Sequence, residues 1–116
     1  MLCSEMSKAL AARGAKVAVL DLNEKAAQAV ADAIVAENGT AMALAVNVLD
    51  RASLETARDE VLKAFGTVDI LINGAGGNKP EATASGSMSF FDIPPEAIQW
   101  VFNLNIIGTI LPTQVF

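Results

Sequence analysis

Residues 68–77 have the sequence VDILINGAGG, an apolar run of strand length followed by a turn rich in glycine. The branched residues at 68–72 are typical of a strand, and Gly74, Gly76 and Gly77 mark the turn. Glycine has no Cβ, so the backbone here can approach a flat or phosphorylated ligand closely. In open α/β sheets the ligand lies at the carboxyl ends of the strands. The stretch therefore predicts a strand that presents its backbone to a ligand; the alternative is a Gly-rich turn that only closes a strand.

Helical and strand patterns alternate outward from this stretch. The expected elements are a helix over 2–13, a strand over 16–20 ending at Asp21, a helix from the cap Asn23 to about 38, a strand over 40–48, a helix from the cap Asp50 to 65, and the strand 68–72. The strands are spaced roughly 25 residues apart, as in βαβ crossovers. This order predicts an α/β fold with a parallel sheet.

The last third of the chain breaks this alternation. Residues 78–93 hold Pro80, Gly86 and several Ser and Thr, which predicts a long loop of the kind that is often functional. Residues 95–111 predict a helix that is apolar on nearly all sides, and therefore buried on two sides. Pro112 is expected to end or kink this helix.

The composition of the 116 residues limits the classes of function. A hydrophobic share of 53% and a mean hydropathy of +0.42 indicate a folded core, while no apolar run reaches the roughly 18 residues of a membrane helix. The net charge of -5 argues against nucleic acid as a partner. The absence of histidine, together with the single cysteine Cys3, argues against a metal site. A single cysteine also fits the reducing environment of the cytoplasm.

The motif Asn73-Gly74-Ala75-Gly76 resembles the Asn-Asn-Ala-Gly motif that follows the fourth strand of short-chain dehydrogenases/reductases, with Gly74 in place of the second Asn. The resemblance extends over nearly the whole chain. It implies a Rossmann-type, doubly wound parallel sheet, of which this chain supplies strands 2, 3 and 4 with the helices between them. It also implies that these four residues bind a nicotinamide cofactor.

Asp21, with its neighbour Leu22, lies where the resemblance places the adenosine ribose of the cofactor. A carboxylate at this strand end can accept both ribose hydroxyls and would repel a 2′-phosphate, which favours NAD over NADP. The alternative is an aspartate that only caps the following helix.

Two further positions match the family. Asn47 and Val48 stand where the family has Asp-Val beside the adenine, and an amide keeps one acceptor for that contact; alternatively, Asn47 is only a polar residue at a strand end. Asn105 matches the Asn of an Asn-x-x-Gly pattern, which belongs to the family's catalytic Asn-Ser-Tyr-Lys tetrad and helps to hold a water in its proton relay. A helix–helix hydrogen bond is the alternative role for Asn105.

Residues 76–83 and 90–116 are similar to family members described as D-mannonate oxidoreductases, which interconvert D-fructuronate and D-mannonate with NAD(H). The resemblance thus implies a small sugar acid as substrate, while the net charge and the lack of a long apolar run argue against nucleic-acid and membrane partners. It also implies a homo-oligomer formed through the helix 95–111.

The family's first strand, its Gly-rich phosphate loop and its Tyr-x-x-x-Lys helix have no counterpart in the sequence, which contains no tyrosine. We therefore expect residues 1–116 to be a partial NAD(P)-binding domain that is inactive by itself. The sheet of this partial domain should have a gap where strand 1 would lie. Two other classes remain open: a non-catalytic nucleotide-binding or assembly module, and an S-adenosylmethionine-dependent methyltransferase, which also has an acid after its second strand.

Overall fold

A two-stranded parallel sheet organises the first half of the chain. The computed structural model describes residues 2–116, and Met1, the first residue of the expected domain, lies outside them. Strand β1 (Lys16–Asp21) pairs with β2 (Thr40–Ala45), in a register that runs from Lys16 opposite Thr40 to Asp21 opposite Ala45. Helix α2 (Glu24–Ala36) connects the two strands, so the predicted βαβ unit with parallel strands is confirmed.

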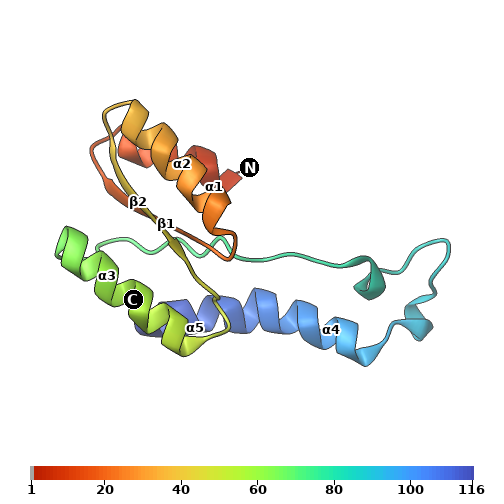
Figure 1. Cartoon of the computed structure of the whole chain (residues 1–116). Helices are drawn as coiled ribbons and strands as arrows, with labels where there is room; N and C mark the ends of the chain where they lie inside the picture. The colour runs from red at the N-terminus through yellow and green to blue at the C-terminus, as the bar shows by residue number, and fades with distance from the viewer. Residues whose placement is uncertain (1) are drawn as a thin grey trace.

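Helices cover both faces of this sheet (Figure 1). Helices α1 (Leu2–Ala11) and α2 lie on one face, where α2 packs on both strands. Helices α3 (Arg51–Phe65) and α5 (Gly108–Val115) lie on the other, where Leu54 and Val115 share a buried cluster with Val46. This arrangement of helices around a parallel sheet is the α/β class that the sequence predicts.

The predicted helix caps are present. The side chain of Asn23 accepts a hydrogen bond from the Ala26 amide at 3.2 Å, and Asp50 accepts one from the Ala52 amide at 3.0 Å. Gly66 ends α3 in the left-handed region, with φ of 85°. Helix α2 ends at Ala36, earlier than expected, because Asn38 takes the left-handed conformation (φ 61°) that terminates it.

The expected strand over residues 68–72 does not form. These residues make no backbone–backbone hydrogen bond to any part of the chain that the structure describes, and β1 pairs with β2 alone. A strand needs a partner for its amides and carbonyls, and the only sheet pairing within the described residues is that of β1 with β2. The predicted strand over 40–48 is also shorter, since β2 ends at Ala45.

The chain from 95 to 115 forms one long helical segment in three parts. These parts are α4 (Pro95–Phe102), a π-helical turn η3 (Asn103–Ile107) and α5. The helix does not end at Pro112, which is buried within α5 against the rest of the domain. Tertiary packing here overrides the local preference of proline, and the departure from α geometry lies upstream, in η3.

Helix α4 and the loop before it extend from the body of the molecule as an arm (Figure 1). The loop carries two short 3₁₀ turns, η1 (Pro80–Ala82) and η2 (Phe90–Asp92), of which η1 packs on α4. The radius of gyration is 16.5 Å, above the roughly 13 Å of a compact domain of about 100 residues. The arm therefore exposes surface that a compact domain would cover.

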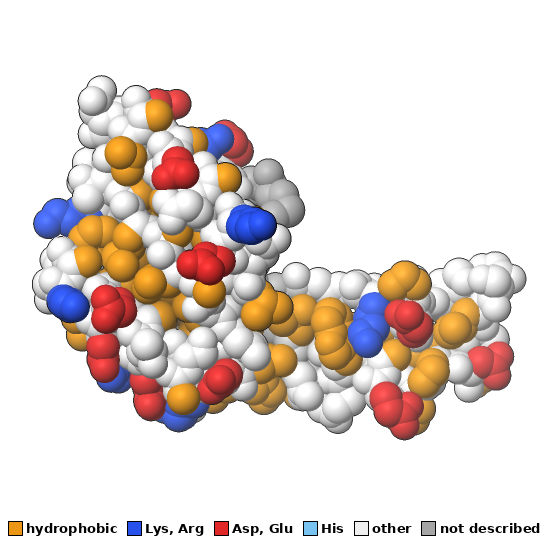
Figure 2. Space-filling view, viewed as in Figure 1, with side chains coloured by type: hydrophobic (Ala, Val, Ile, Leu, Met, Phe, Trp, Pro, Cys, Tyr) orange, Lys and Arg blue, Asp and Glu red, His pale blue; other side chains and the backbone are white. Residues whose placement is uncertain are grey.

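The expectation that the last helix is buried on two sides is wrong for this chain. Ile98, Phe102, Ile106 and Ile110 recur every four residues along one face, and they are 53%, 52%, 44% and 44% exposed. Hydrophobic side chains line the arm in Figure 2. The opposite face packs on η1 and α3, and residues 2–116 supply no element that covers the exposed face. None of the helices in this range is long and apolar enough to span a membrane.

Candidate functional site

The Gly-rich turn is joined to the last helix by a reciprocal pair of hydrogen bonds. The side-chain Nδ2 of Asn105 donates to the carbonyl of Gly77 at 2.7 Å, and its Oδ1 accepts from the amide of Gly77 at 3.2 Å. Nδ2 also donates to the carbonyl of Val101 at 2.8 Å. Both amide hydrogens of Asn105 are thus engaged, and its orientation relative to the turn is fixed.

A second bond fastens the other end of the same turn. The side-chain Nδ2 of Asn73 donates to the hydroxyl of Thr113 at 2.9 Å. The Thr113 hydroxyl in turn donates to the carbonyl of Thr109 at 2.7 Å, and the Thr109 hydroxyl donates to the carbonyl of Asn105 at 3.0 Å. The turn 73–77 is therefore attached to the helix at both ends, through residues spaced four apart on one helical face.

Asn105 lies in the middle of the π-helical turn η3. Such turns interrupt the usual i to i−4 hydrogen-bond pattern and are frequent at functional sites. Its neighbour Gly108 is buried, and a Cβ at that position would come within 3.0 Å of Val48 Cγ2. The small residue thus lets the helix approach the chain that follows β2.

The glycines of the turn are required by the protein's own side chains. A Cβ on Gly76 would lie 2.8 Å from Asn105 Oδ1, and a Cβ on Gly74 would overlap the sulfur of Cys3. The amides of Gly74, Ala75 and Gly76 make no hydrogen bond within the described chain. They are exposed, so they remain available as donors.

Asp21 lies at the carboxyl end of β1, with its side chain exposed. Its Oδ1 accepts a hydrogen bond from the Asn23 amide at 2.8 Å, and Oδ2 has no bond to a residue of the described chain. Leu22 is 76% exposed beside it. The carboxylate therefore accepts a bond within the turn before α2, whose N-cap is Asn23, and its second oxygen has no bond within the described chain.

Asn47 is engaged with its own loop. Its side-chain Oδ1 accepts a hydrogen bond from the backbone amide of Leu49 at 3.0 Å, and its own backbone amide donates to the hydroxyl of Ser53 at 3.1 Å. The side-chain NH2 group of this exposed residue makes no bond to another described residue. Its donors remain available at the end of β2.

One small cavity, of about 70 Å³, brings several of the candidate residues together. Val48, Asn73, Gly74 and Ala75 line it, along with apolar residues of β1, α3 and α5. Asp21, Leu22, Asn47, Gly76 and Asn105 do not line it. The structure thus places the turn beside the chain that follows β2, while Asp21 and Asn105 lie outside that cavity.

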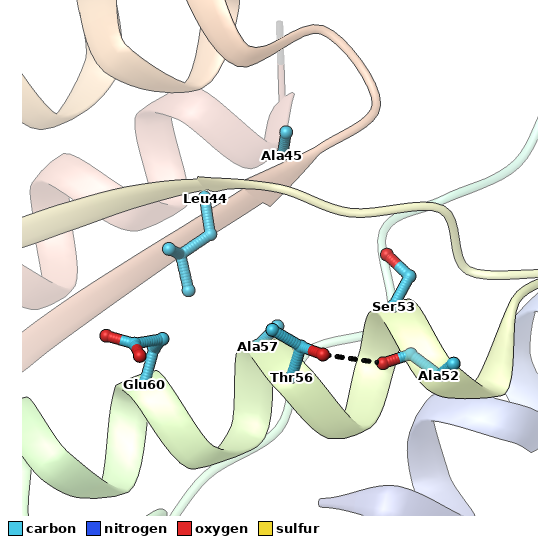
Figure 3. A pocket seen from close by; sticks show the side chains of 7 residues that line it. All are labelled: Leu44, Ala45, Ala52, Ser53, Thr56, Ala57 and Glu60. Carbon is cyan, nitrogen blue, oxygen red and sulfur yellow. Dashed lines mark hydrogen bonds between the residues drawn. The ribbon is translucent and has the colours of Figure 1, made fainter.

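A larger, open hollow of about 300 Å³ lies between the end of β2 and α3 (Figure 3). Leu44 and Ser53 point toward it, and Glu60 lies at one end. None of the residues singled out from the sequence lines this hollow. No cluster of three or more potential metal-ligating side chains is found among residues 2–116.

Gly77, Thr109 and Thr113 belong to the site but were not among the residues assigned from the sequence. The spacing of Asn105, Thr109 and Thr113 was the available signal, because residues four apart share one helical face. Nothing local to Asn73, however, indicates that its partner lies on that face. That pairing is a property of the tertiary fold.

The chain is similar to known proteins in both sequence and fold. A family model described as short chain dehydrogenase matches residues 2–116. An uncharacterized oxidoreductase, UxuB, of Bacillus subtilis is 46% identical over the whole chain, and an uncharacterized oxidoreductase of Haemophilus influenzae is 44% identical. The chain covers 45% and 44% of these two proteins, so it spans less than half the length of its relatives.

A solved structure from Haemophilus influenzae matches the whole chain with a TM-score of 0.93 at 44% identity. That protein is described as a proposed D-mannonate oxidoreductase with bound NAD, and 45% of its chain is covered. A 7α-hydroxysteroid dehydrogenase complexed with NADH matches with a TM-score of 0.80 at 31% identity.

Proposed function

Because this chain belongs to the short-chain dehydrogenase family, we propose that the natural protein containing it is an NAD-dependent oxidoreductase that interconverts D-fructuronate and D-mannonate. The family match and the oxidoreductase relatives favour this chemistry over a methyltransferase. The sugar-acid substrate is supported by the similarity to the proposed D-mannonate oxidoreductase. The observation that carries the proposal is the reciprocal bonding of Asn105 to Gly77, the residue that directly follows the motif 73–76.

The chemistry of the free polar groups fits NAD. The unpaired oxygen of Asp21 can accept a ribose hydroxyl, and the carboxylate would repel a 2′-phosphate. The unbonded amides of Gly74, Ala75 and Gly76 can donate to the cofactor, and Leu22 and Val48 offer apolar contacts beside the adenine. The side-chain donors of Asn47 complete the proposed cofactor contacts. When bound, NAD would accept the hydride in the oxidation and NADH would donate it in the reduction.

We assign Asn105 to the proton relay. Its two amide hydrogens are committed to Gly77 and Val101, so it can contribute only as an acceptor. Oδ1 has two lone pairs, of which Gly77 uses one, and the second can hold the hydrogen of a water. In this role Asn105 orients a water and fixes the Gly-rich turn at the same time.

The 116 residues are proposed to be part of a larger Rossmann domain. The unpaired residues 68–72 and the free edge of β1 support this, because both need a strand beside them. The coverage of 45% of the relatives agrees with it. We expect the isolated 116-residue polypeptide to lack turnover, since it has no tyrosine to exchange a proton with the substrate.

A homo-oligomer through residues 95–111 is proposed from the exposed stripe of Ile98, Phe102, Ile106 and Ile110, which an equivalent helix could cover. The cytoplasm is proposed as the compartment, because a single cysteine fits a reducing environment.

The non-catalytic nucleotide-binding module remains the second candidate function. Tight NAD binding without turnover would distinguish it from the oxidoreductase.

The testing experiment uses the natural-length protein. Its intact mass is first compared with 12.1 kDa, the mass of these 116 residues. NAD binding is then measured by calorimetry, and NADH oxidation is followed with D-fructuronate. NAD binding with turnover of D-fructuronate supports the proposal. NAD binding without turnover of any keto substrate supports the non-catalytic nucleotide-binding module. Turnover of other substrates but not of D-fructuronate removes the sugar-acid assignment.

A further inference from the structure

Lys79 is the only lysine or arginine in residues 64–116. It follows the Gly-rich turn by two residues and precedes the 3₁₀ turn η1. Its ammonium lies 4.6 Å from the centroid of the Trp100 ring on α4. This geometry is a cation–π contact, which holds the charge at one place on the arm.

The charge of Lys79 has no carboxylate partner among the residues that the structure describes. The ion pairs there involve Lys8, Arg51 and Arg58, each with an acid on its own helix. An aromatic ring occupies one side of an ammonium and leaves donors free on the others. Lys79 is therefore able to receive an anion while it stays in contact with Trp100.

The backbone around Lys79 is fixed by a closed set of hydrogen bonds. The amide of Lys79 donates to Asn78 Oδ1 at 2.9 Å, and Asn78 Nδ2 donates to the hydroxyl of Thr83 at 2.9 Å. That hydroxyl donates back to the carbonyl of Lys79 at 3.1 Å. Both the main chain and the side chain of Lys79 are thus held in place before any ligand binds, which lowers the entropy lost on binding.

This fixed cation lies next to the candidate site along the chain. Gly77, two residues earlier, is bound by Asn105 in both directions. Consecutive Cα atoms are about 3.8 Å apart, so the Cα atoms of Gly77 and Lys79 are within roughly 8 Å. The lysine side chain reaches several ångströms farther. The two lengths together are comparable to the length of a six-carbon sugar acid.

We propose that Lys79 binds the carboxylate of the substrate and so selects a sugar acid over a neutral sugar. This inference rests on the proposed function, whose substrate is an anion. The carboxylate keeps its charge throughout a keto–hydroxy interconversion, so the contact has similar strength in the ground state and the transition state. Uniform binding of this kind changes KM and leaves kcat nearly unchanged.

The test uses the natural-length enzyme with NADH and two substrates, D-fructuronate and its neutral counterpart D-fructose. Lys79→Met should raise the KM for D-fructuronate by roughly tenfold or more, the usual effect of losing a hydrogen bond to a charged group, with kcat within about twofold. Any activity on D-fructose and the affinity for NAD should not change. Lys79→Arg should restore most of the KM, since it keeps the charge and the ring contact.

Lys16 gives a matched control, because its ammonium also lies near an aromatic ring, 6.0 Å from the centroid of Phe65. Lys16 is on β1, far along the chain from the arm. Lys16→Met should leave both KM values unchanged. Thermal unfolding checks the fold of each variant, and Lys79→Gln replaces Lys79→Met if the latter is unstable. If the enzyme is active and the folded Lys79→Met or Lys79→Gln variant has an unchanged KM for D-fructuronate, the role of Lys79 is overturned and the proposed function stands. A wild-type enzyme that does not oxidise NADH with D-fructuronate removes the proposed function and this inference together.

Discussion

Asn73 and Thr113 are 40 positions apart in the sequence, and the amide of the first donates to the hydroxyl of the second across 2.9 Å. Asn105 and Gly77 form the matching attachment 28 positions apart. The three residues between these anchors, at 74–76, make no hydrogen bond within the described chain and so can bind a ligand. The helix therefore sets the position of a turn whose own donors are unused.

Thr113→Val in the natural-length enzyme should weaken NAD binding about three- to tenfold, because the turn loses one of its two anchors and a neutral hydrogen bond contributes roughly 0.5–1.5 kcal/mol. Thr113→Ser keeps the hydroxyl and should restore the affinity. Thr56 also donates its hydroxyl to a helical carbonyl, that of Ala52, away from the turn, so Thr56→Val is the control. Calorimetric dissociation constants for NAD check this; equal values for the two valine variants would contradict it.

Gly76→Ala should lower both stability and activity, since its Cβ would lie 2.8 Å from Asn105 Oδ1 and must displace the amide from Gly77. Overpacking of this kind costs about 1–3 kcal/mol. Gly86 has no atom within 4 Å of the corresponding position, so Gly86→Ala should behave as wild type. Urea unfolding and kcat measure the two variants. A Gly76→Ala enzyme with unchanged kcat would show that Asn105 can move without loss of function.

Asp21→Asn should reduce the preference for NAD over NADP by roughly 10- to 100-fold, the effect expected for hydrogen bonds to a charged acceptor. The amide oxygen can still accept the bond from the Asn23 amide, so the turn after β1 should persist. Asp32 is also an exposed, hydrogen-bonded carboxylate, on α2, and Asp32→Asn provides the control. The ratio of kcat/KM values for the two cofactors is the measurement, and an unchanged ratio would exclude Asp21 from the ribose site.

The elements that form from local information were predictable from the sequence. Helices α2 and α3 begin at the expected caps, Asn23 and Asp50, because capping depends on residues within one turn. The parallel pairing of β1 and β2 follows from their single connecting helix. Two family motifs predicted the turn and Asn105 as site residues, and in the structure Asn105 is hydrogen-bonded to Gly77 at the end of that turn.

The features that were not predictable depend on neighbours distant in sequence. Residues 68–72 have a strand-like composition but no partner strand in the described chain, so composition alone gave the wrong assignment. Pro112 lies inside α5 because its ring is buried in the domain, although proline usually ends a helix. The two threonine contacts of the site likewise require the helix and the turn to be packed together first.

Ile106→Lys should dissociate the proposed oligomer of the natural-length protein. Ile98, Phe102, Ile106 and Ile110 form an apolar stripe on α4 and its continuation, and Ile106 is 44% exposed in a central position. A charge there would be buried without a partner in any helix-to-helix interface, which is strongly destabilising. Val35 is 54% exposed on α2, far from the stripe in sequence, so Val35→Lys makes the same chemical change as a control. Sedimentation velocity should give a smaller species for Ile106→Lys only. If both variants and the wild type sediment alike as oligomers, the assembly uses another surface, and the stripe is covered by another part of the same protein.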